Sequence, residues 1–122
     1  MFWKKKKKFI VDDFAFLLDY GFSRKKYLRA PDVEYVFIRN DLEIELAYYL
    51  GVLETYEQAM CFCVIISNIN GRNNLLQCSE VFGADLINKL IADIKDLDAD
   101  AQVPLYAQFL KDNIDTLLNY KV

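Results

Sequence analysis

Carboxylates are the side chains in this 122-residue chain whose type and spacing come closest to a reactive site. They gather at residues 12–13, at Glu43 and Glu45, and at residues 96–100. Carboxylates brought close together can bind a divalent cation or act as general acid and base. Residues 12–13 are also typical of a helix start, and residues 96–100 lack the Gly and the terminal Glu of a calcium loop. We interpret these groups as solvated acidic surface, with Glu43 and Glu45 best placed to contact a partner.

Other reactive groups are scarce. The chain has no histidine, which excludes Ser-His-Asp and Cys-His nucleophiles and His-containing zinc sites. Its four glycines are too scattered for a phosphate-binding loop. Cys61, Cys63 and Cys78 are too few for a zinc site, so we expect reduced thiols in the core of a cytosolic protein. The sequence therefore predicts a binding protein without enzymatic activity, cofactor or metal.

Charge is unevenly distributed along the chain. Five lysines at positions 4–8 follow Phe2 and Trp3, whereas residues 9–122 carry ten cations against eighteen carboxylates. We expect residues 1–8 to form a basic N-terminal arm and residues 9–122 a single acidic domain. The arm either stays solvated, lies against the acidic body, or adds attraction to a membrane or RNA. An acidic body argues against nucleic acid as the main partner.

No targeting or membrane-spanning segment is apparent. Asp12 and Asp13 interrupt the apolar residues after the lysines too early for a signal peptide. The longest apolar stretch, residues 59–66, has the length of a strand and is too short to cross a bilayer. We therefore expect a cytoplasmic protein for which a membrane is not the main partner.

The elements that must position these side chains follow from periodicity. Residues 9–20 have the apolar spacing of an amphipathic helix ending at Gly21, with Ile10, Phe14, Leu17 and Leu18 on one side. A period of two then predicts strands at 23–29, 33–39 and 42–50 and a strand buried on both faces at 60–66, the first a basic edge strand.

Helical periodicity returns in the last third of the chain. Asp85 is the predicted cap of a helix that runs to Leu97, and Pro104 fits the first turn of a final helix. The predicted fold is α+β, with an N-terminal helix, an antiparallel sheet of about four strands and two to three C-terminal helices.

A tight turn at Asn40-Asp41 fixes which side chains share a face of the sheet. It places Phe37 opposite Ile44 and Tyr35 opposite Leu46 on an apolar face. The opposite face is mixed, and a mixed face is either partly covered by a helix or presented to a partner. Our predicted partner-binding residues lie on this second face: Glu34, Glu43, Glu45 and Tyr49.

Three parts of the chain resemble a known group of proteins. The segment from Phe9 to Phe22 contains Asp12-Asp13-Phe14 and ends in Tyr20-Gly21-Phe22. This segment, the hairpin with outward Glu residues, and the segment from Leu105 to Leu118 resemble small bacterial proteins linked with immunity to polymorphic or contact-dependent toxins. The resemblance covers about a third of the chain and implies a bacterial protein that binds and neutralises a toxin domain. An acidic binder would suit a cationic toxin. The alternatives are a self-associating structural or regulatory module, as a homodimer, and a peripheral protein held to membrane or RNA by its lysine arm.

Overall fold

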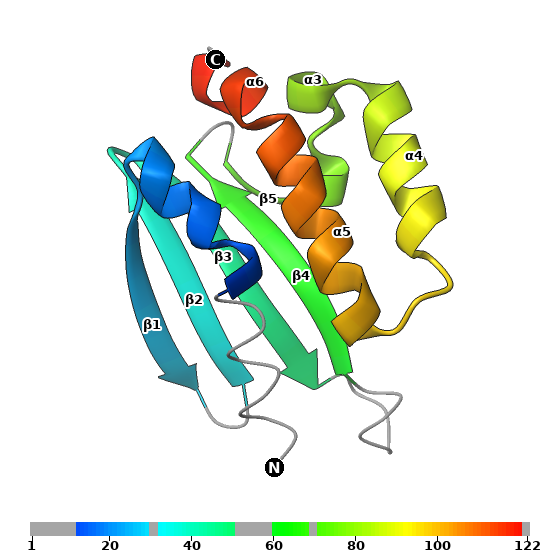
Figure 1. Ribbon diagram of the computed structural model, residues 1–122, viewed down its shortest axis with the longest axis horizontal. Helices are drawn as coiled ribbons and strands as arrows, with labels where there is room; N and C mark the ends of the chain where they lie inside the picture. The colour runs from blue at the N-terminus through cyan, green and yellow to red at the C-terminus, as the bar shows by residue number, and fades with distance from the viewer. Residues whose placement is uncertain (1–11, 30–31, 51–59, 69–70, 121–122) are drawn as a thin grey trace.

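The computed structural model describes residues 12–29, 32–50, 60–68 and 71–120, with the backbone alone at 26–29, 32–34, 47–50 and 60–61. Five strands form one antiparallel sheet whose spatial order follows the chain (Figure 1). They are β1 (Ser23–Arg29), β2 (Asp32–Arg39), β3 (Leu42–Leu50), β4 (Met60–Ser67) and β5 (Arg72–Asn74). The fold is therefore mixed helix and sheet, with one strand more than the sequence predicted.

Hairpin pairing agrees with the predicted register. Phe37 pairs with Ile44 and Tyr35 with Leu46, and the basic strand β1 lies at the edge of the sheet. Asn40 has a φ of 54°, the left-handed conformation that a two-residue turn demands and that Asn tolerates. The strand pairing therefore confirms the prediction of which hairpin residues share a face.

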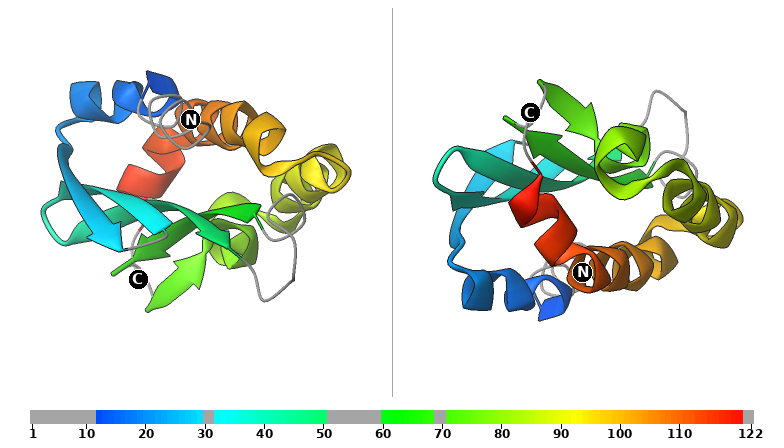
Figure 2. Two further views of the ribbon diagram at one scale, coloured as in Figure 1. Left: turned by 90° about the horizontal axis from the view of Figure 1, so that it is seen from below. Right: turned by 90° about the horizontal axis from the view of Figure 1, so that it is seen from above.

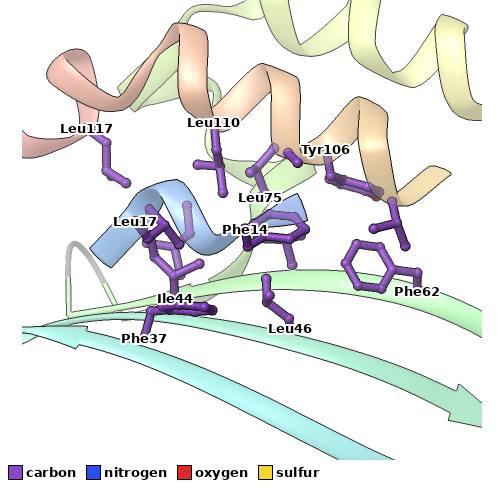
Figure 3. Close-up of a cluster of buried hydrophobic side chains, with 14 of the residues drawn as sticks. Phe14, Leu17, Phe37, Ile44, Leu46, Phe62, Leu75, Tyr106, Leu110 and Leu117 are labelled. Carbon is purple, nitrogen blue, oxygen red and sulfur yellow. The ribbon is translucent and has the colours of Figure 1, made fainter. Parts of the chain in front are cut away.

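The faces of the sheet differ in burial. Phe62, Val64 and Ile66 of β4 are buried, whereas Cys63 and Ile65 between them are half-buried, so the prediction of a strand buried on both faces was wrong. Apolar residues alone do not bury a strand unless a second layer covers each face. The buried face packs against the helices in one core (Figure 3), whose fully buried large side chains are Phe14, Leu17, Phe37, Ile44, Leu46, Val64, Ile66, Leu75, Val103, Leu110 and Ile114.

The N-terminal helix differs from the predicted amphipathic α-helix. Its regular part is a 3-10 helix, η1 (Ala15–Tyr20), that ends at Gly21 in the left-handed conformation; residues 9–11, with Ile10, lie outside the described residues. A 3-10 helix turns 120° per residue, so Phe14 and Leu17 align and are both buried, while Leu18 points away and is 44% exposed. Leu18 therefore does not belong to the buried stripe.

Helices complete the chain after β5. They are η2 (Leu75–Gln77), α3 (Ser79–Phe82), α4 (Ala84–Ile94), α5 (Ala99–Asp112) and α6 (Ile114–Asn119). Figure 2 shows α5 and η1 on the same side of the sheet, where α5 packs on β4. In contrast, α4 packs mainly on α5, α3 and η2 at the margin of the fold.

Two of the predicted helix starts were misplaced. The N-cap of α4 is Gly83, with no side-chain cap, and Asp85 lies in the first turn. Asp98 caps α5, where its Oδ1 accepts a hydrogen bond from the Ala101 N–H at 2.9 Å. Pro104 consequently lies in the second turn of α5, where its missing N–H removes one helical hydrogen bond.

Candidate functional site

The outer face, defined as the side of the sheet opposite η1 and α5, is the strongest candidate site. Strand pairing arranges its residues in rows that cross all five strands. One row contains Ser23, Ile38, Glu43, Ser67 and Arg72, and the next contains Lys25, Val36, Glu45, Ile65 and Asn74. None of these ten residues belongs to the core cluster.

Apolar side chains lie at the centre of this face. Val36 is only 6% exposed, and Ile38 and Ile65 are half-buried. Val36 and Ile65 pair with Glu45 from either side, so that carboxylate lies between two aliphatic neighbours. Apolar side chains are typical of the centre of a protein interface, whereas charged side chains are more common at its polar rim.

Charge has a definite order on the outer face. Lys25 on β1 and Arg72 on β5 lie at the two edges of the sheet, whereas Glu43 and Glu45 lie on the central strand β3. A complementary partner would therefore present cations opposite β3. Like charges placed face to face would repel each other.

Glu45 already makes an ion pair within the chain. The Arg72 side chain extends from β5 across β4, and its Nη2 donates to both Glu45 oxygens, at 3.1 Å to Oε1 and 3.2 Å to Oε2. The exposed fraction is 59% for the Arg72 side chain and 13% for that of Glu45. The Glu45 side chain is therefore largely shielded from solvent, whereas that of Arg72 is mostly exposed.

The structure places all four predicted site residues on one face by strand register, and describes the side chains of Glu43 and Glu45. Glu43 and Glu45 are both half-buried there, two residues apart on β3. Glu34 pairs with Ala47 and Tyr49 with Cys61, register positions on the same face; their side chains lie outside the described ones. Sequence reasoning missed Arg72, because β5 has only three residues, Arg-Asn-Asn, and shows no apolar alternation.

A small cavity lies between the end of the sheet and the helices. It measures about 140 Å³ and is lined by Ile66, Asn73, Gln77, Cys78, Glu80, Val81 and Tyr120. The Cys78 thiol donates to the Asn74 carbonyl oxygen at 3.4 Å, and burial raises the pKa of the thiol. A raised pKa disfavours the thiolate, which is the reactive form, so the arrangement is that of a structural cysteine.

Metal and membrane sites are not found in the described part of the chain. No group of three or more Cys, Asp or Glu side chains there is arranged to hold a metal ion. Among the same residues, no helix has the length and apolar character needed to cross a bilayer.

The chain was compared with known proteins. It matches no protein-family model, no curated protein and no solved structure. The outer face is therefore the feature of this chain from which a function can be inferred.

Proposed function

We propose that the chain is a non-enzymatic protein-binding module that acts through its outer face, most specifically as an immunity protein that binds and neutralises a toxin domain. The observation that carries this proposal is the position of Glu43 and Glu45 on β3, among the aliphatic side chains of Val36, Ile38 and Ile65. Such a face offers apolar contact area and charge selectivity together.

The charge order on the outer face supports a different protein as the partner, rather than a second copy of this chain. Two copies packed through their outer faces would bring the Glu43 and Glu45 carboxylates of one copy towards those of the other. Like charges juxtaposed in an interface are unfavourable by several kcal/mol. A partner with a cationic centre, as expected of a toxin that acts on an anionic substrate, avoids this repulsion. Self-association remains the alternative that the proposal must exclude.

Co-expression tests the proposal directly. If a neighbouring gene encodes a toxin domain, that domain is produced in a sensitive cell with and without the chain, and growth is measured. We expect the chain to restore growth and the purified pair to form a stable complex. Growth that stays arrested, without any complex, would refute the proposed function.

Charge reversal then tests the surface. Glu43 has no ion pair with another described residue, so Glu43→Lys changes the charge of the outer face without breaking a described ion pair. Asp96→Lys makes the same charge change on an exposed residue just after α4, where a cation suits the helix dipole. We expect Glu43→Lys to weaken the complex at least tenfold and Asp96→Lys to leave it unchanged. Equal effects of the two variants would remove the outer face from the proposal.

A further inference from the structure

We propose that Glu45 is a receptor for an arginine side chain of the partner, and that Arg72 occupies this receptor in the free protein. The inference deepens the proposed function and rests on it for the identity of the protein that carries the arginine. It rests on the geometry of the Arg72–Glu45 pair and on the aliphatic neighbours of Glu45.

The setting of Glu45 suits a guanidinium better than an ammonium group. An arginine side chain has a planar charged end that can donate two parallel hydrogen bonds to a carboxylate, and a methylene stem that packs on apolar surface. Glu45 is 13% exposed, and its pairing partners Val36 and Ile65 are aliphatic. A lysine ammonium is more strongly hydrated and cannot form the two parallel bonds.

The intramolecular pair uses the carboxylate incompletely. Both of its hydrogen bonds come from one atom, Arg72 Nη2, at 3.1 and 3.2 Å, instead of from two nitrogens side by side. The Arg72 side chain is 59% exposed. An ion pair with so exposed a partner contributes little stability, so a better-oriented guanidinium can displace Arg72 at small cost.

A peptide titration tests this inference without a known partner. The probe is acetyl-Gly-Arg-Gly-amide, compared with the lysine peptide of the same length, and the readout is the amide shift changes of Val36, Glu45 and Ile65 in ¹H–¹⁵N spectra. In Arg72→Met, which vacates the carboxylate but keeps an apolar stem, we expect the arginine peptide to bind about 3- to 5-fold more tightly than in the native chain. The lysine peptide should bind several-fold more weakly to the same variant.

Three further variants make the test specific. Glu45→Gln should abolish the arginine preference, because it removes the carboxylate. Lys89→Met is the matched control, since it frees Asp93 from an exposed ion pair of 3.2 Å on α4, and it should give no gain. Arg72→Gln also removes the guanidinium from Glu45 but introduces a polar side chain. It should reproduce the tighter binding of the arginine peptide if Arg72→Met perturbs the sheet.

The possible outcomes separate the two proposals. Three outcomes would each overturn the receptor inference. The arginine peptide could bind the native chain and both Arg72 variants equally, the two peptides could bind equally well, or Lys89→Met could give the same gain. A toxin domain that binds the native chain while the arginine peptide shows no dependence on Arg72 overturns the inference alone. An arginine peptide that behaves as expected, beside a toxin domain that is not neutralised, overturns the proposed function alone.

Discussion

The ring of Phe62 on β4 meets the ring of Tyr106 on α5 edge to face, with centroids 5.3 Å apart and an angle of 70° between the planes. Both side chains are almost completely buried. Edge-to-face aromatic pairs add attraction beyond their buried area because the positive ring edge meets the negative face. This contact fixes the main covering helix on the strand beneath it, and so holds the sheet whose opposite side is the outer face.

Truncation at this contact should be costly. We expect Phe62→Ala to lower the free energy of unfolding by about 3–5 kcal/mol, because it leaves a cavity under α5 and removes the aromatic pair. Urea denaturation followed by circular dichroism measures the change. Leu86→Ala, at a residue of α4 that is 43% exposed, is the control and should cost less than about 1 kcal/mol. Similar losses for both variants would contradict the central place of Phe62 in the core.

Gly21 should resist substitution for a backbone reason. It has a φ of +88°, and a Cβ atom there would lie 3.4 Å from Arg39 Nε. We expect Gly21→Ala to lower stability by about 1–2 kcal/mol and Gly21→Asn by less, since Asn tolerates the left-handed conformation. Thermal denaturation of the two variants gives the order. An alanine variant as stable as the asparagine variant would exclude backbone strain as the cause.

The cap of α5 provides a local test of helix stability. Asp98 accepts a hydrogen bond from the Ala101 N–H, so Asp98→Ala should cost about 1 kcal/mol. Asp96→Ala removes an exposed acid two residues earlier and should have little effect. Hydrogen exchange at the first turn of α5 should accelerate in the Asp98 variant alone, and unchanged exchange there would argue against the cap.

Asp13 predicts a dependence of stability on pH. Its Oδ2 atom is buried without a hydrogen-bond partner among the described residues, and burial, followed by the charge of Asp12, raises the pKa of this carboxyl above 3.8. A pKa raised in the folded state means that stability is lost as pH rises from 3.8 through the folded pKa, because ionisation is easier in the unfolded chain. We expect Asp13→Asn to be more stable than the native chain at pH 7, by about 1 kcal/mol, and equally stable near pH 3.

Denaturation curves at several pH values test this expectation. Asp19→Asn, at an exposed residue of η1, is the control variant. A stability difference between Asp13→Asn and the native chain that does not change with pH would show that ionisation of Asp13 is not responsible.

The charge order of the outer face also predicts the oligomeric state. Because Glu43 and Glu45 of two copies would repel each other, we expect a monomer whose mass in light scattering does not change between micromolar and submillimolar concentrations. A concentration-dependent dimer that Glu43→Lys disrupts would favour the self-associating module instead.

Local patterns predicted the hairpin well, and tertiary pairing explains most of what they missed. The alternation through Tyr35, Phe37, Ile44 and Leu46, joined by a two-residue turn, determined both the register and the face that carries Glu43. By contrast, β5 has no apolar residue, and it forms a strand because its backbone pairs with β4. The Arg72–Glu45 pair depends on that strand, so no spacing along the chain could have revealed it.

The helix types were harder to predict than the helix positions. Spacing along the chain located the segment from Phe14 to Gly21, but the difference between 3-10 and α geometry depends on how Phe14 and Leu17 fit the core. That difference exposes Leu18, which the α-helical period had buried. The N-caps of α4 and α5 are likewise Gly83 and Asp98, whereas the sequence had suggested Asp85 as a cap and Pro104 in a first turn.

The order of elements along the chain also affects how the protein emerges from the ribosome. All five strands are complete by Asn74, whereas α5 ends at Asp112. During synthesis, nearly forty more residues must therefore be added before α5 can cover the apolar side chains of the sheet. Until then, only the side chains under η1 are covered. Exposed strands of this kind invite association between nascent chains. Slow translation after β5 should accordingly increase aggregation, and a chaperone that shields the sheet until α5 is made should restore the yield.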